Sequence, residues 1–264
     1  MLNRGLRICV LLLLCLCVGV PAASNNIDAV MRSVVALSGQ SSGGETVFAS
    51  AFMVEARERN RVWLVSSAHS FASITGDFAR VSLRRFERNI YRPLPFQVRI
   101  RAGGRALYFT HQNFDLAAIK IELPAEADYC VLSRDFIADE KQLKRVAAGA
   151  GTQVLIPGFP YGESCNDAGF AFARSGVISS FPLCPASIYP IFHVDFEVFA
   201  GYSGAPVIFA GSGGALLLGM VLEEVFLEEL RSQKGKKQLR TRRGLGLARV
   251  LSAPLLGDFI ASLR

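Results

Sequence analysis

The sequence has 264 residues, of which 51% are hydrophobic, and a formal net charge of +7. Seven of its lysines and arginines lie in segment 231–243, where no aromatic residue is interleaved to stack on bases. After the first 24 residues, the longest apolar stretch, 205–225, is interrupted by the GSGG of 211–214. We therefore expect no nucleic-acid partner and no membrane span in the mature chain.

The first 24 residues have the pattern of a secretory signal peptide. Arg4 and Arg7 precede an apolar run of 13 residues, 8–20, and small residues with one proline follow it at 21–24. The run is too short to cross a bilayer comfortably. We expect cleavage near this point and a secreted or periplasmic mature protein of about 240 residues.

The rest of the chain reads as short extended runs separated by turn residues, which is typical of a β-sandwich or barrel. Strands are predicted at 34–37, 46–55, 61–66, 81–83, 98–101, 116–121, 153–156, 170–180, 192–196, 205–209, 215–225 and 244–249. Helices are predicted at 133–146 and 253–263. The fold class is therefore all-β, with two six-stranded antiparallel barrels at 25–125 and 151–264, a linker at 126–150 and a C-terminal helix.

Three polar residues stand in apolar surroundings. Ser203 lies in GYSGAPV (201–207), whose small residues suit either a loop that a substrate approaches or a plain turn between strands. His69 follows the apolar strand 61–66, where a histidine satisfied by the structure is the alternative. Asp115 opens another apolar strand, and a buried carboxylate needs a partner.

Together these residues form a catalytic set. A serine hydroxyl becomes a nucleophile when a base takes its proton, histidine is the natural base near neutral pH, and a carboxylate orients the imidazole. All three histidines precede Ser203, which excludes the residue order of α/β-hydrolases. The spacing places His69 and Asp115 on the first barrel and Ser203 on the second. No pair of histidines has metal-ligand spacing, so we expect neither a metal nor a cofactor.

The motifs LVSSAHSF, FDLAAIKI and GYSGAPVI resemble the histidine, aspartate and serine motifs of chymotrypsin-fold (trypsin-like) serine peptidases. The pieces SVVAL, ASAFMVE, VLIPGFPYG, RSGVISS and FHVDFEVFAGYSGAPVI are similar to the single-chain bacterial-type branch that includes the high-temperature-requirement peptidases. The similarity covers about residues 33 to 262. It implies a secreted serine endopeptidase that acts on proteins or peptides through an acyl-enzyme, with Ser203 as nucleophile, His69 as general base and Asp115 as orienting carboxylate.

The same resemblance implies the surrounding site. The N–H groups of Gly201 and Ser203 would form the oxyanion hole. Glu197, six residues before the nucleophile, would lie at the base of the primary specificity pocket, with the further substrate-binding residues Val198, Leu222 and Glu224. An inward Glu197 favours Arg or Lys before the scissile bond, whereas an outward Glu197 leaves a small apolar pocket.

The sequence departs from the family at two positions beside the nucleophile. Tyr202 stands where the family has Asp or Asn, and Ala205 stands where glycine is more common. A different class of function is therefore a peptidase-fold binding protein with suppressed turnover, which holds a partner on its basic surfaces.

Three further expectations concern the rest of the chain. Cys165 and Cys184 flank the predicted strand 170–180 and are expected to pair, leaving Cys130 free. Segment 231–243 is expected to be an exposed, mobile excursion between two strands. The sequence ends about sixty residues after Ser203, which leaves no room for the peptide-binding PDZ domain of many such peptidases.

Overall fold

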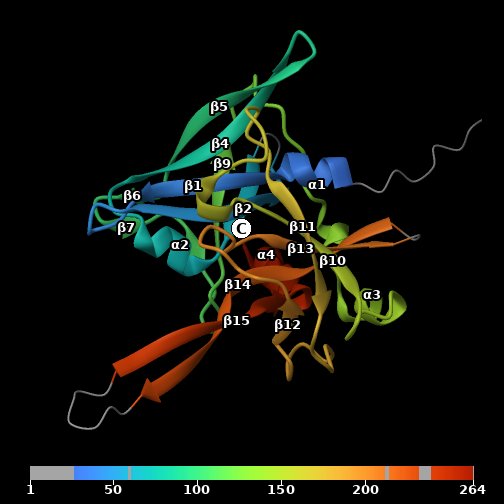
Figure 1. Cartoon of the computed structure of the whole chain (residues 1–264). Helices are drawn as coiled ribbons and strands as arrows, with labels where there is room; N and C mark the ends of the chain where they lie inside the picture. The colour runs from blue at the N-terminus through green and yellow to red at the C-terminus, as the bar shows by residue number, and fades with distance from the viewer. Residues whose placement is uncertain (1–26, 59–60, 212–213, 232–238, 264) are drawn as a thin grey trace, which may run out of the picture.

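The chain forms an antiparallel sheet followed by a closed antiparallel barrel, as the computed structural model in Figure 1 shows. The structure describes residues 27–58, 61–211, 214–231 and 239–263. The predicted signal peptide lies outside the described residues. The all-β prediction is confirmed, and the predicted C-terminal helix is present.

The first half consists mainly of one sheet. Its elements are α1 (Ile27–Ser33), β1 (Val34–Gln40), β2 (Thr46–Glu55), β3 (Arg61–Ser66), α2 (Ala68–Ser73), β4 (Phe78–Glu87), β5 (Ile90–Arg99), β6 (Arg101–Ala102), β7 (Arg105–Ala106), β8 (Phe109–Thr110) and β9 (Ala117–Glu122). Seven strands pair in the order β5-β4-β1-β2-β3-β9-β8, and β6 pairs with β7. This linear order differs from the closed six-stranded barrel that we predicted, because no pairing among the described strands joins β5 to β8.

The difference arises mostly in the long β4–β5 hairpin. Two short strands were predicted at 81–83 and 98–101, whereas each observed strand has ten residues. Pro93 and Pro95 concealed β5 in the sequence, and they are tolerated there because β5 is an edge strand with one unpaired side. Arg88 and Asn89 form the turn with positive φ angles of 51° and 62°, as a tight hairpin requires.

The second half contains a six-stranded closed barrel in the order β10-β11-β12-β15-β14-β13. Its elements are η1 (Arg134–Phe136), α3 (Glu140–Arg145), β10 (Gln153–Gly158), η2 (Pro160–Gly162), β11 (Phe172–Ile178), β12 (Ile191–Asp195), β13 (Pro206–Gly211), β14 (Gly214–Arg231), β15 (Leu239–Ser252) and α4 (Ala253–Ser262). The single helix predicted at 133–146 is wrong. Asp139 caps α3 by accepting a hydrogen bond from Gln142 N (2.7 Å), which separates α3 from η1.

The basic segment 231–243 is partly a β-ribbon. Strands β14 and β15 stay paired from Phe226↔Gly244 to Arg231↔Leu239, beyond the ends predicted from the sequence, and the ribbon projects from the barrel (Figure 1). Glu228 lies opposite Arg242, whose guanidinium is 3.7 Å from the centre of the Phe226 ring. Acidic residues on β14 thus offset the positive charge of β15. Residues 232–238 lie outside the described residues.

The predicted Cys165–Cys184 disulfide is wrong, since both residues are free, as is Cys130. Strand β11 lies between the two cysteines, and its seven extended residues separate its ends by about 20 Å. A disulfide needs Cα atoms within roughly 7 Å. The extended strand β11 therefore places the two loops that carry the cysteines at its opposite ends.

The two halves share a hydrophobic core. One cluster of buried side chains includes Phe52 and Trp63 from the first sheet together with Val207 and Leu218 from the barrel. The buried cluster shared by the sheet and the barrel packs these two parts of the chain against each other.

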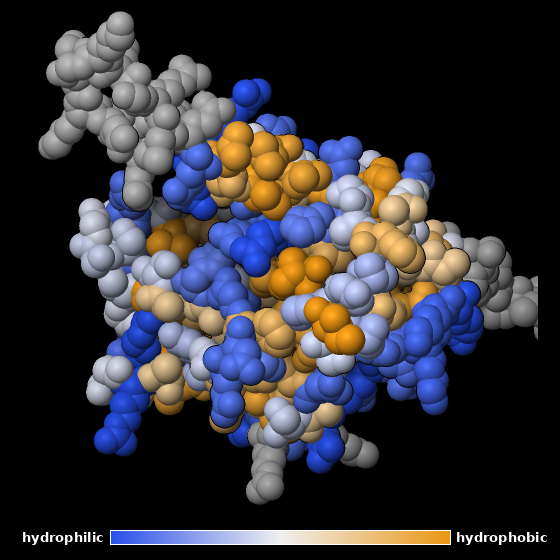
Figure 2. All heavy atoms as spheres, turned by 90° about the horizontal axis from the view of Figure 1, so that it is seen from below, coloured by the Kyte–Doolittle hydropathy of each residue, from blue (hydrophilic) through white to orange (hydrophobic). Residues whose placement is uncertain are grey.

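No helix in the described part of the chain is both long enough and apolar enough to span a membrane. On the face seen from below, hydrophobic side chains are exposed among hydrophilic ones (Figure 2).

Candidate active site

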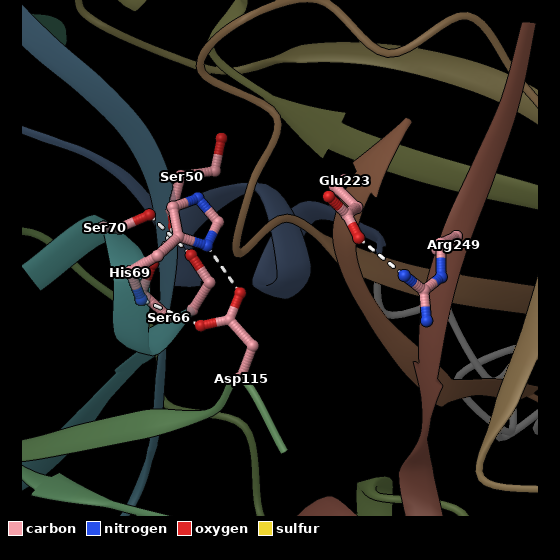
Figure 3. Close-up of polar contacts among 8 residues, drawn as sticks. Ser50, Ser66, His69, Ser70, Asp115, Glu223 and Arg249 are labelled. Carbon is pink, nitrogen blue, oxygen red and sulfur yellow. Dashed lines mark hydrogen bonds and ion pairs between the residues drawn. The ribbon is translucent and has the colours of Figure 1, made fainter. Parts of the chain in front are cut away.

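Strand pairing brings His69 and Asp115 together. Ser66 at the end of β3 lies opposite Ala117 at the start of β9, so the residues just after Ser66 meet those just before Ala117. His69 lies in the first turn of α2, and its Nδ1 is 2.5 Å from Asp115 Oδ2 (Figure 3). The backbone N–H of His69 donates to the other carboxylate oxygen, Oδ1, at 2.8 Å. Both oxygens of Asp115 are therefore used to hold one histidine.

The electrostatics of this pair define the tautomer of His69. The hydrogen bond with Asp115 raises the pKa of His69; burial opposes the shift, and the charges of Asp115 and Glu223 add to it. Burial raises the pKa of Asp115, but its hydrogen bonds with His69 outweigh that effect, so the pKa lies below the usual value. An ionised carboxylate only accepts hydrogen bonds, so Nδ1 of His69 carries the proton. In the neutral imidazole, Nε2 is then left with a free lone pair.

The loop around Ser203 is bonded to the first sheet through Ser50 of β2. Ser50 N donates to Ser203 O (2.9 Å), and Ser50 Oγ donates to Gly201 O (2.7 Å). Ser66 Oγ in turn donates to Ser50 O (2.7 Å). Ser50 and Ser66 are fully buried. The sequence reasoning missed both, although a serine inside an apolar strand is the signal that could have identified them.

Gly204 brings the Ser203 loop against the end of β3. A Cβ at position 204 would lie 2.2 Å from both Ser50 O and Ser66 Oγ, which only glycine allows. Gly204, the residue after Ser203, therefore contacts Ser66. Ser66 lies three residues before His69. The Ser203 side chain makes no hydrogen bond within the part of the chain that the structure describes, including to His69.

The peptide groups before Ser203 are oriented by η2. Tyr161 N donates to Ala200 O (2.6 Å), and Gly201 has a φ of +101°. In a trans peptide the N–H points away from the C=O, so the Gly201 N–H points away from Tyr161. A Cβ at position 201 would lie 2.1 Å from Phe159 O, which excludes other residues. In the described chain, neither Gly201 N–H nor Ser203 N–H donates a hydrogen bond.

Comparison with solved structures decides the fold. An HtrA-type protease, AlgW with a tripeptide, superimposes with a TM-score of 0.52 and 18% identity over 92% of this chain. A serine endoprotease from Yersinia pestis superimposes with a TM-score of 0.51 and 14% identity over 90% of this chain. The chain has the fold of an HtrA-type protease.

The similarity covers only part of each of these two structures. The chain spans 63% of the length of the AlgW chain and 64% of the Yersinia chain. The sequence matches no protein-family model and no curated protein. At these identities the similarity concerns the chymotrypsin-like fold, as the motifs around His69, Asp115 and Ser203 predicted.

The two candidate specificity carboxylates, Glu197 and Glu224, line different surface hollows of the described chain. Glu197 is exposed, and its backbone oxygen accepts a hydrogen bond from Arg174 Nη1 (3.0 Å). Glu224 accepts a hydrogen bond from Gly246 N (3.3 Å), which directs its carboxylate toward β15. Val198 is half-buried and Leu222 is buried. The two apolar side chains are therefore less exposed than Glu197.

The site contains an ion pair that the sequence reasoning did not assign. Glu223 Oε1 lies 2.6 Å from Arg249 Nη1, across the β14–β15 pairing and beside the His69–Asp115 pair (Figure 3). Val221, two residues before Glu223 on β14, accepts a hydrogen bond from Gly204 N (2.8 Å). Glu223 thus continues the strand that supports the Ser203 loop, and its charge acts on His69.

Proposed function

We propose that the chain is an exported serine endopeptidase that cleaves protein or peptide substrates. The observation that carries the proposal is the His69–Asp115 pair with a free Nε2, placed at the end of the strand against which Gly204 packs the Ser203 loop. Export follows from the predicted signal peptide at 1–24. The fold shared with HtrA-type proteases supports the same reaction class.

In the proposed reaction, Ser203 Oγ attacks the carbonyl carbon of the scissile peptide bond while its proton moves to His69 Nε2. The carbonyl oxygen becomes an oxyanion, which the N–H groups of Gly201 and Ser203 stabilise. The proton on Nε2 then passes to the leaving amine as the C–N bond breaks, and the acyl-enzyme remains. Water, deprotonated by the same nitrogen, releases the acid and restores Ser203. Asp115 stabilises the imidazolium in both halves of the reaction.

A fluorophosphonate probe tests this function, because it reacts with a serine whose hydroxyl is activated by a base. We expect one covalent adduct on Ser203, found by intact mass and peptide mapping. His69→Ala protein should label far more slowly, and Ser203→Ala protein should not label. A wild-type protein that stays unlabelled and hydrolyses no peptide would support the alternative of a peptidase-fold binding protein, which Tyr202 beside the nucleophile makes a specific candidate.

We further propose a small apolar pocket for the residue before the scissile bond, lined by Val198 and Leu222. The exposed position of Glu197 supports this choice over a basic preference. Matched peptides with Val, Phe or Arg before the cleaved bond should be hydrolysed with the highest kcat/KM for Val. Glu197→Gln should leave this order unchanged, because its carboxylate does not contact the substrate.

Leu222→Ala is the variant that should change the preference. It enlarges the proposed pocket and should shift the preference from Val toward Phe. One methylene-sized change is worth about 1 to 3 kcal/mol in such a pocket, or roughly 10- to 200-fold in kcat/KM. A wild-type preference for Arg that Glu197→Gln abolishes would contradict the apolar pocket.

A further inference from the structure

Tyr202, the residue that departs from the family pattern, is fully buried directly before the proposed nucleophile. A Cβ at Gly158 would lie 2.6 Å from its ring, and its ring meets that of Phe196 edge-on with centroids 5.0 Å apart. The hydroxyl Oη is buried and has no hydrogen-bond partner among the described residues. Burial raises the pKa of the Tyr202 hydroxyl and the nearby Arg174 opposes that rise, so the ring packing and this cation together fix residue 202.

One cation packs against this ring and its neighbours. The guanidinium carbon of Arg174, on β11, lies 4.5 Å from the Phe196 ring centre, 5.0 Å from that of Phe199 and 5.4 Å from that of Tyr202. Arg174 Nη1 also donates to Glu197 O (3.0 Å). Among the described residues Arg174 forms no salt bridge, so its partners are the aromatic faces, one carbonyl and the nearby Tyr202 hydroxyl, whose pKa it lowers against the effect of burial.

The three aromatic residues lie in residues 196–203, which we call the oxyanion segment because it contains the proposed oxyanion donors Gly201 and Ser203. Phe199 O accepts a hydrogen bond from Tyr202 N (3.1 Å), and the Phe199 ring lies 5.9 Å from that of Tyr161, whose N–H holds Ala200 O. The orientation of the Gly201 N–H follows from the position of that carbonyl. Displacing the rings would therefore rotate the peptide groups that face the oxyanion.

We propose that Arg174 is a positioning residue, whose guanidinium holds Phe196, Phe199 and Tyr202 so that the N–H groups of Gly201 and Ser203 stay directed at the oxyanion. The role rests on the proposed peptidase function and extends it to a residue outside the catalytic set. A planar guanidinium can lie flat on several rings while its fixed fork of N–H groups donates a hydrogen bond, whereas a lysine ammonium is a compact point charge on a flexible stem. Aromatic Tyr202 and Arg174 thus work together in place of a polar residue at position 202.

The test compares Arg174→Met, Arg174→Lys and Tyr202→Phe in the full chain. Arg174→Met should lower kcat by about 10- to 100-fold per active site titrated with fluorophosphonate, because losing one oxyanion donor outright costs about 10²- to 10³-fold and misdirecting it should cost less. Its KM should stay within about threefold of the wild type. Arg174→Lys should recover part of the loss. Tyr202→Phe, which keeps the ring and removes only the hydroxyl, should lose less kcat than Arg174→Met.

Inhibition by a peptide aldehyde separates positioning from a general structural role, because the aldehyde forms a tetrahedral oxyanion on the serine. Its affinity should fall in Arg174→Met by the same factor as kcat. Where Arg174→Met fails to fold, Phe199→Leu removes one ring at a half-buried position and should lower both quantities in the same direction.

The outcomes distinguish the two levels of the proposal. Wild-type kcat per titrated site in Arg174→Met, or lost kcat with unchanged aldehyde affinity, would overturn the role of Arg174 and leave the peptidase function intact. A wild-type protein without labelling or turnover would overturn the peptidase function and, with it, this role.

Discussion

Replacing Ser203 with alanine should lower the rate of peptide hydrolysis by a factor on the order of 10⁴ to 10⁶ and leave thermal unfolding nearly unchanged. The rate falls because alanine has no oxygen to attack the carbonyl. Stability is kept because the Ser203 side chain makes no hydrogen bond within the described chain, and its backbone oxygen still accepts from Ser50 N. Initial rates on a fluorogenic peptide and a melting curve measure the two quantities.

The catalytic set can be tested as a unit with His69→Ala and the double variant. Without the base, the serine hydroxyl stays protonated, so His69→Ala alone should lose about as much activity as Ser203→Ala, and combining them should add little. Ser41→Ala, in the turn between β1 and β2, is the matched control and should keep full activity. Near-normal hydrolysis by pure Ser203→Ala protein would contradict the proposed nucleophile.

The sequence identified the parts of the site that local patterns encode. His69 and Asp115 flank apolar runs, and the observed strands β2 and β3 have the predicted bounds. Once β3 and β9 pair, the two polar residues must meet at one end of the sheet. Residue type and strand order were therefore sufficient to predict that His69 and Asp115 lie together.

The supports of the Ser203 loop depend on contacts between distant parts of the chain and left little trace in the sequence. Ser50 and Gly201 are 151 positions apart, and their hydrogen bond follows only from the packing of sheet against barrel. Arg174 sits on an alternating strand, where an arginine usually indicates a solvent-facing position. Its stacking on three rings requires the folded path of residues 196–202.

The closing prediction concerns Asp115→Asn, which should lower kcat on the order of 10⁴-fold. Asp115 accepts hydrogen bonds on both oxygens, from His69 N on Oδ1 and from His69 Nδ1 on Oδ2. Asparagine has one oxygen and one NH₂ group. If its oxygen accepts from His69 N, the NH₂ faces Nδ1 and forces the proton onto Nε2, which can then no longer act as a base. In the flipped orientation the NH₂ opposes the backbone N–H.

The pH profile gives Asp115→Asn a second signature. His69 must be neutral to accept the serine proton, so kcat/KM falls on the acid side as the imidazole becomes protonated. The hydrogen bond with Asp115 is the largest cause that raises the pKa of His69, so the wild-type acid limb should lie above the ordinary histidine value. Removing the carboxylate lowers that pKa and should move the limb to lower pH. Asp258, an exposed carboxylate on α4, is not among the groups that shift the pKa of His69, so Asp258→Asn should change neither the plateau nor the limb. An Asp115→Asn enzyme within tenfold of the wild-type rate, or one with its acid limb at higher pH, would contradict the orienting role of Asp115.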